Sequence, residues 1–104
     1  MGDHPRHQLD ELLCHGVRLS VLAALDGPER VEFAVVRDGV QVSDSVLSKQ
    51  VALLEQAGYV AVEKGRVGRR ARTWLAATPE GSVALRSHLR AVRDVATHDI
   101  SAQI

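Results

Sequence analysis

The amino-acid sequence predicts one small α+β domain that is mainly helical and contains a single basic β-hairpin. Three observations point to this fold class. Apolar residues recur at steps of three and four in three separate segments, which is the spacing of helices with one buried face. Two runs rich in β-branched and aromatic residues flank a connection with glycine and arginine, as in a hairpin. The chain has 104 residues, 45% hydrophobic and 25% charged, which suits a single globular domain with a core over about residues 9–96.

The composition excludes several classes of protein. Thirteen basic and thirteen acidic residues give a formal net charge of zero, so any binding to a polyanion requires local clustering of charge. No apolar run approaches the roughly 18 residues needed to span a bilayer. Cys14 is the only cysteine, and residues 1–5 lack the basic-then-apolar pattern of a secretion signal. We therefore expect a cytoplasmic protein with no membrane partner. Because so short a chain buries a limited core, we also expect self-association.

The first helix is predicted over residues 9–25, where leucine and valine recur on one face. Gly16 is expected to bend or break it. Gly27 and Pro28 end this segment, because glycine accepts a left-handed cap and proline cannot continue the hydrogen-bond ladder.

Two short elements and a second long helix follow. Residues 30–32 suit a very short edge strand, and residues 33–38 suit a short helix that Gly39 stops. Ser43 is a good N-cap for a helix over residues 44–57, because its hydroxyl accepts a backbone N–H of the first turn.

The hairpin is predicted from strands at residues 59–64 and 72–76, joined by residues 65–71. The two glycines of this connection permit the positive φ values that hairpin turns often need. The hairpin and its flanks hold five cations and no acid between them, namely Lys64, Arg66, Arg69, Arg70 and Arg72.

The last helix starts with Thr78 as N-cap, Pro79 at the first helical position and Glu80 in the first turn. Its apolar residues form a narrow heptad-like seam, which suits pairing with another helix. The chain ends, residues 1–7 and those after about Thr97, are expected to fray. The predicted dimer interface combines this seam with the first helix and consists of Leu9, Leu12, Leu13, Leu85, Leu89, Val92 and Ala96.

Three stretches of the chain together resemble a known family. They are LEQAGYV at residues 54–60, GRRARTW at 68–74 and TPEG at 78–81. Over about residues 9–95 the chain resembles small winged helix-turn-helix transcription regulators related to the MarR and ArsR groups. One departure is that these regulators usually have glycine two residues before the N-cap of the recognition helix, where this chain has Gln41. The resemblance implies a winged helix-turn-helix with a basic β-hairpin wing and a C-terminal dimerisation helix.

The residues themselves favour binding to double-stranded DNA. The helix over residues 44–57 turns short polar side chains and one lysine away from its apolar face, and such side chains reach base edges or phosphates in a major groove. The arginine-rich wing suits phosphates or a narrow minor groove. Asp44 would repel phosphate unless it accepts a hydrogen bond from cytosine N4. The predicted DNA-binding residues are Ser43, Asp44, Ser45, Ser48, Lys49, Lys64, Arg66, Arg69, Arg70 and Arg72.

We expect a homodimeric repressor, since 104 residues leave no separate domain for recruiting polymerase. Two alternatives stay open, a winged-helix module that binds a protein and a metal-responsive sensor of the ArsR kind. For a sensor, the candidate ligands are His4, His7, Cys14, His15, Asp94 and His98.

No Cys-x-x-Cys or His-x-x-x-His pair is present, so surface histidines and a small buried cysteine are the favoured interpretation. No catalytic residue, metal or cofactor is predicted, because paired carboxylates, a phosphate loop and a nucleophile elbow are all missing from the sequence. Nothing in the sequence indicates a small-molecule effector.

Overall fold

The computed structural model describes residues 3–101 and confirms the α+β, mainly helical fold class. Three antiparallel strands form one sheet in the order β1-β3-β2. In chain order the elements are the 3-10 helices η1 (Pro5–Gln8) and η2 (Glu11–Leu13), α1 (Gly16–Leu25), β1 (Val31–Glu32), α2 (Phe33–Val40), α3 (Asp44–Gln56), β2 (Val60–Val67), β3 (Arg70–Ala77) and α4 (Pro79–Thr97).

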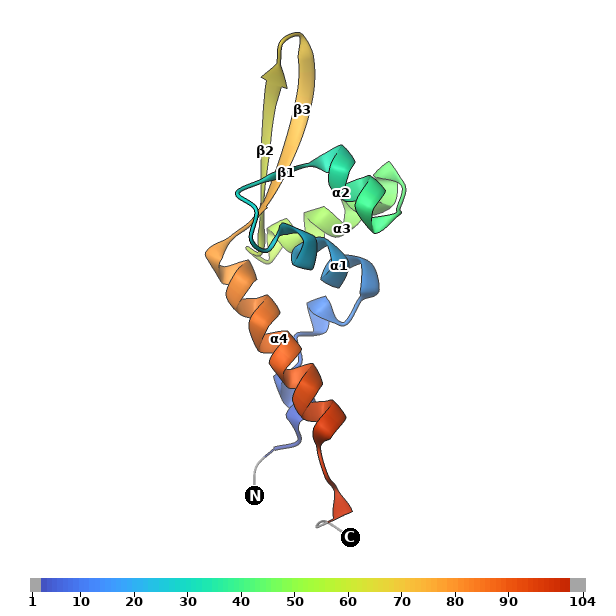
Figure 1. Cartoon of the computed structure of the whole chain (residues 1–104), viewed down its shortest axis with the longest axis vertical. Helices are drawn as coiled ribbons and strands as arrows, with labels where there is room; N and C mark the ends of the chain where they lie inside the picture. The colour runs from blue at the N-terminus through green and yellow to red at the C-terminus, as the bar shows by residue number, and fades with distance from the viewer. Residues whose placement is uncertain (1–2, 102–104) are drawn as a thin grey trace.

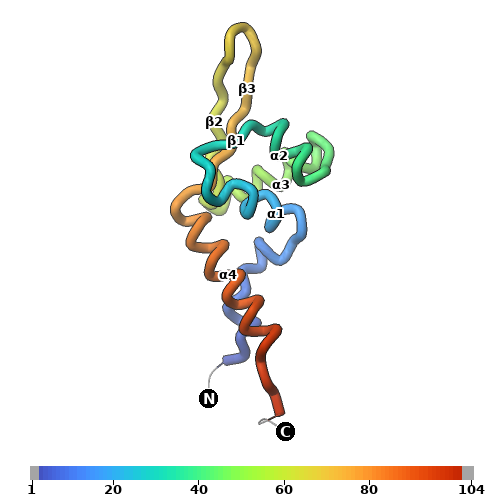
Figure 2. Tube along the Cα trace, viewed as in Figure 1, coloured from blue at the N-terminus to red at the C-terminus, as the bar shows by residue number. Residues whose placement is uncertain are grey.

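The molecule is elongated, with extents of 65 × 25 × 20 Å. Figure 1 shows the β2–β3 hairpin projecting from one end and α4 leading away to the other, with α1, α2 and α3 between them. In Figure 2 the N-terminal segment runs beside α4, and η1 contacts that helix. The hairpin and the free end of α4 are therefore the two most separated parts of the fold.

The core lies where α1, α3 and the base of the sheet meet. Each of these elements contributes leucines to it, and fully burying such a side chain contributes about 1.5–3 kcal/mol. The largest fully buried side chains are Leu13, Leu22, Leu25, Leu47, Leu54, Leu75 and Val21.

The two N-caps predicted from the sequence are confirmed. The Ser43 hydroxyl accepts the backbone N–H of Val46 at 3.2 Å, where α3 begins. The Thr78 hydroxyl accepts the backbone N–H of Gly81 at 2.9 Å and donates to the carbonyl of Gly58 at 2.5 Å. Thr78 thus fixes the start of α4 against the turn that follows α3.

The prediction of one helix over residues 9–25 is wrong before Gly16. The expected break falls just before that glycine, where His15 has extended backbone and is the N-cap of α1. Asp10 caps the separate 3-10 helix η2 by accepting the backbone N–H of Leu12 at 3.0 Å. The apolar spacing was misleading because η2 still places Leu13 in the same core.

The predicted stop of the short helix at Gly39 is also wrong. α2 continues to Val40, and Gln41 takes the left-handed conformation with φ of 64° that ends it. The backbone N–H of Gln41 donates to the carbonyl of Arg37 at 2.9 Å. Gln41 thus adopts the geometry for which the related regulators have glycine.

The hairpin connection is much shorter than the seven residues predicted. The strands pair as far as Val67 and Arg70, so only Gly68 and Arg69 form the turn. Gly68 has a φ of +63°, as such a tight turn requires, whereas Gly65 lies inside β2 opposite Arg72. Both strands are therefore longer than the runs of β-branched and aromatic residues from which they were predicted.

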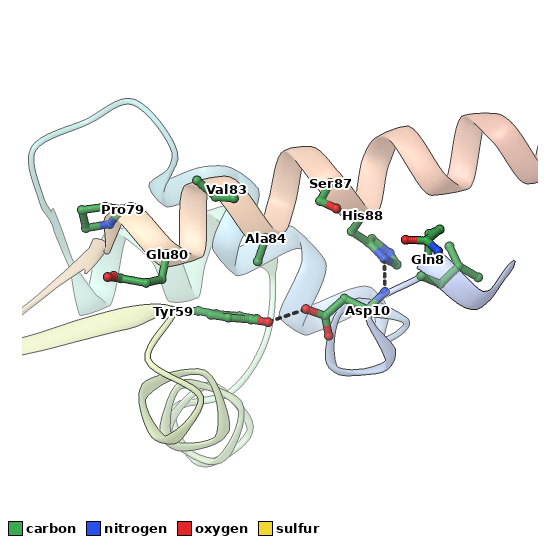
Figure 3. Close-up of a pocket in the computed structure, with 10 residues that line it drawn as sticks. Gln8, Asp10, Tyr59, Pro79, Glu80, Val83, Ala84, Ser87 and His88 are labelled. Carbon is green, nitrogen blue, oxygen red and sulfur yellow. Dashed lines mark hydrogen bonds between the residues drawn. The ribbon is translucent and has the colours of Figure 1, made fainter. Parts of the chain in front are cut away.

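The prediction that residues 1–7 fray is wrong for residues 5–7, which lie in η1 against α4, while residues 1–2 lie outside the described residues. Just after η1, the Asp10 backbone N–H donates to His88 Nδ1 at 3.0 Å, and the Tyr59 hydroxyl donates to Asp10 Oδ2 at 2.5 Å. Figure 3 shows Asp10 between these two side chains. All three residues line a hollow of about 630 Å³. The bond to Asp10 raises the pKa of Tyr59 to about 12.

At the C-terminal end of the chain, α4 stops at Thr97 as expected, and residues 102–104 lie outside the described part.

Candidate nucleic-acid interface

The outer face of α3 is exposed over its first two turns and is polar except for Val46, which is 40% exposed. Its inner face buries Leu47, Val51 and Leu54 in the core. The predicted DNA-binding residues of this region are all exposed, namely Ser43, Asp44, Ser45, Ser48 and Lys49. The Ser43 hydroxyl is already used as the N-cap and lies 3.2 Å from that of Ser45. Among these five residues, Ser48 and Lys49 therefore have the smallest role in holding the fold together.

The hairpin presents most of its predicted cations to solvent. Lys64, Arg66, Arg69 and Arg70 are exposed, and the Arg66 guanidinium donates to the carbonyl of Arg69 at 3.5 Å across the tip. Arg72 differs, because its Nε lies 3.4 Å from the Glu32 carboxylate of β1 and both side chains are about one-third exposed. Arg72 thus fastens β3 to β1, a role that its sequence position did not show.

A groove of about 420 Å³ separates α3 from the sheet and brings three predicted residues together. Asp44 and Ser48 line it from α3, and Lys64 lines it from β2. Phe33 and Leu75 contribute apolar lining. The helix and the hairpin therefore form a single continuous surface.

Arg37 is a functional candidate that the sequence did not reveal. Its Nη1 lies 2.9 Å from Asp44 Oδ1, and its Nε lies 2.8 Å from Asp38 Oδ1. The pKa of Arg37 lies above its ordinary value, chiefly because of the hydrogen bond to Asp38 and next because of the bond to Asp44. The hydrogen bond from Arg37 lowers the pKa of Asp38. Only the fold brings residues 37 and 44 together, across the turn between α2 and α3.

Arg30 and Trp74 stabilise the base of the hairpin through a contact that the sequence did not predict. The Arg30 guanidinium lies 4.2 Å from the ring centroid of Trp74, and its Nη1 lies 3.2 Å from the Glu63 carboxylate. Trp74 pairs with Glu32 of β1 on one side and with Glu63 of β2 on the other. All three strands are thus tied together at this level.

The residues predicted for a dimer interface do not share one surface. Leu13 and Leu85 are core residues of the single chain, 0% and 4% exposed, because α4 turns Leu85 toward α1 and the sheet. Leu9 and Leu12 are half-buried, and Ala96 is exposed. On α4, an exposed apolar stripe contains the predicted Leu89 and Val92 and the unforeseen Val95, whereas Val83, also exposed, lies on another side of the helix.

The histidines and the cysteine differ from the favoured interpretation in two ways. Cys14 is exposed, and His88 is only 2% exposed because it faces the N-terminal segment. The rings of His4 and His98 meet edge to face with centroids 4.7 Å apart. Across residues 3–101, no three histidine, cysteine or acidic side chains gather as a metal ion would require. In the same part of the chain, no helix has the length and apolarity of a membrane span.

These features, a helix-turn-helix followed by a β-hairpin beside the second helix, define a winged-helix DNA-binding domain. The family model described as "Winged helix DNA-binding domain" matches residues 17–96, and the chain belongs to this family. It is a small winged-helix regulator related to the MarR family, as the resemblance in the sequence implied, and the family is one of DNA-binding regulators, not enzymes.

Several known proteins are similar to the chain. A transcriptional regulator homologue from Pyrococcus horikoshii has a TM-score of 0.77 at 22% identity, over 84% of this chain and 86% of that one. A MarR family regulator from Streptomyces coelicolor, solved with DNA, has a TM-score of 0.64 at 27% identity, over 95% of this chain and 69% of that one. An uncharacterized protein of Methanocaldococcus jannaschii is 30% identical over 73 residues, 70% of this chain and 79% of that protein.

Proposed function

We propose that residues 9–96 form one unit that binds double-stranded DNA sequence-specifically and represses transcription as a homodimer. The observation that supports this most directly is the continuous surface of α3 and the hairpin, which meet at a shared groove lined by Asp44, Ser48 and Lys64. This surface matches the shape of a DNA duplex, in which the helix would enter a major groove and the wing would contact the neighbouring backbone. The similar Streptomyces coelicolor regulator was solved in complex with DNA, which agrees with this proposal.

α3 is the proposed recognition helix. Ser48 and Lys49 are exposed, whereas Leu47 and Leu54 of the same helix are buried. Lysine donates to guanine and serine contacts either bases or phosphates, so this face suits base edges in a major groove. Because neither side chain takes part in the core, both are free to read sequence.

The wing is the proposed contact to the backbone or the minor groove. Arg66, Arg69 and Arg70 are exposed at the end of a hairpin that projects beyond the helices (Figure 1). Arginines without acidic neighbours at the tip favour phosphates and the negative potential of a narrow minor groove. They would contribute affinity that depends strongly on salt.

The proposed dimer forms through the exposed stripe of α4 together with Leu9, Leu12 and Ala96. Leu89 and Val92 are 47% and 43% exposed and neighbour each other on α4, and such adjacent exposed apolar side chains indicate an interface more than a single one would. A two-fold interface on α4 would present two copies of α3 to successive major grooves. Such a dimer would cover neighbouring grooves and exclude polymerase, which is the basis for proposing repression.

The test measures fluorescence anisotropy of the purified protein with the DNA upstream of its own coding region and with a scrambled duplex, at one salt concentration. Lys49→Ala and Ser48→Ala are compared with Gln56→Ala, an exposed change at the far end of α3. Loss of a base contact should weaken specific binding by about 1–3 kcal/mol and spare scrambled DNA. Wild-type protein that binds both duplexes equally would contradict sequence specificity. In vitro transcription from the upstream DNA then tests repression, and unchanged transcript levels would contradict that part.

A further inference from the structure

The α2–α3 corner contains a charge cluster whose arrangement is at odds with a surface that binds DNA. One cation, Arg37, is shared by two acidic side chains, Asp38 and Asp44. The three charges sum to −1. A net negative charge at the start of the recognition helix repels phosphates unless the cluster rearranges when DNA arrives.

The ion pair between Arg37 and Asp44 is exposed enough to exchange partners. Asp44 is 70% exposed and Arg37 is 32% exposed, so water reaches both ends of the bond. Exposed ion pairs of this kind are weak, because solvent competes with each partner. Guanidinium groups bind phosphate through paired, charge-assisted hydrogen bonds, so a nearby phosphate competes well for Arg37.

The two residues occupy the positions that such an exchange needs. Arg37 lies in the last turn of α2, the first helix of the helix-turn-helix, which crosses the DNA backbone in proteins of this architecture. Asp44 is the first residue of α3, and residues at the start of a recognition helix contact base edges. Asp44 also lines the groove that holds Ser48 and Lys64, so it lies on the same side as the proposed reading residues.

We propose that Arg37 leaves Asp44 for a backbone phosphate when α3 enters the major groove, and that the released Asp44 accepts a hydrogen bond from N4 of a cytosine. This inference rests on the proposed function and deepens it. Arg37 contributes affinity for any sequence. Asp44 contributes preference for cytosine, because a carboxylate accepts from cytosine N4, has no donor for the acceptors of guanine or thymine, and is repelled by the N7 acceptor that stands beside the N6 donor of adenine. In the free protein, the Asp44 carboxylate is paired with Arg37.

The experiment selects binding sites from a pool of random duplexes with wild-type protein, Asp44→Asn, Arg37→Gln and the control Asp38→Asn. Wild-type sites should hold a cytosine at one position of each half-site, and Asp38→Asn should select the same base. Asp44→Asn should lose this preference, with discrimination at that position falling by roughly 5- to 150-fold. Arg37→Gln should weaken binding to selected and scrambled duplexes alike and reduce the slope of log K against log salt by about one. Circular dichroism of each variant checks that the fold is intact.

The outcomes separate the exchange from the proposed function. If wild-type protein binds no duplex, the proposed function fails and this inference fails with it. If wild-type protein selects a site but Asp44→Asn selects the same bases, the reading role of Asp44 is refuted while DNA binding stands. An unchanged salt slope in Arg37→Gln refutes the phosphate contact. A purely structural ion pair would change the unfolding midpoint of these variants but neither the selected bases nor the slope.

Discussion

Gly81 is the position where one added methyl group should do most damage to the fold. A Cβ there would overlap the carbonyl oxygen of Tyr59 and would lie 2.9 Å from the carbonyl carbon, both backbone atoms of the residue just before β2. Ordinary contact between carbon atoms is about 3.5–4.0 Å, so α4 would have to move roughly 0.6 Å or more away from the sheet. That displacement also strains the bond from the Thr78 backbone N–H to the Tyr59 carbonyl, 3.0 Å long.

We therefore expect Gly81→Ala to lower the free energy of unfolding by about 2–3 kcal/mol, at the upper end of overpacking effects. For a domain of this size that corresponds to a fall in Tm of roughly 10–20 °C. Urea denaturation followed by circular dichroism measures it. Gly39→Ala is the matched control, because Gly39 lies within α2 with nothing within 4 Å of the added Cβ. It should stabilise the protein by about 0.5–1 kcal/mol, since alanine favours helix. Equal stability of Gly81→Ala and wild type would refute the close approach of α4 to β2.

Three further predictions concern the wing, the dimer and the only tyrosine. Arg69→Ala combined with Arg70→Ala should weaken binding to specific and scrambled DNA alike and reduce the salt slope by about one per lost phosphate contact, as measured by anisotropy at several salt concentrations. Leu89→Asp should convert the proposed dimer to monomer in analytical ultracentrifugation, and a wild-type protein that is already monomeric would contradict the interface. The phenolate absorbance of Tyr59 should titrate near pH 12, because the bond to Asp10 favours the protonated form. Since the folded pKa is raised, this bond contributes stability below pH 10 that is lost as the pH rises toward 12, and Tyr59→Phe should abolish that part of the loss.

The starts of α3 and α4 were predictable because the chemistry of their N-caps is local. Ser43 and Thr78 form hydrogen bonds to backbone groups three residues away, so a short stretch of sequence contains everything that the cap requires. The inner face of α3 was predictable for a similar reason, because the spacing of Leu47, Val51 and Leu54 matches the helical period.

Features that depend on tertiary packing were not predictable in this way. Leu85 and Leu89 are four residues apart and look equivalent in the sequence, yet the first lies in the chain's own core and the second is exposed. Arg72 and Arg37 were also ambiguous, because their acidic partners come from other elements that only the fold brings near. Of the ten predicted DNA-binding residues, Arg72 and Asp44 form ion pairs in the structure that the sequence did not reveal.

β1, which adds a third strand to the hairpin, supports only the base of the wing. β1 pairs with β3 at Leu75 and Trp74 alone, so the hairpin from Lys64 to Thr73 outward is a two-stranded ribbon without further cover. Isolated two-stranded ribbons are marginally stable in water and twist readily. The outer wing should therefore open and close locally at a small fraction of the global unfolding free energy, while the base exchanges its amide hydrogens slowly. In the proposed complex with DNA the tip would adapt to grooves of different width, and the entropy lost when the ribbon becomes ordered would offset part of the affinity of its arginines.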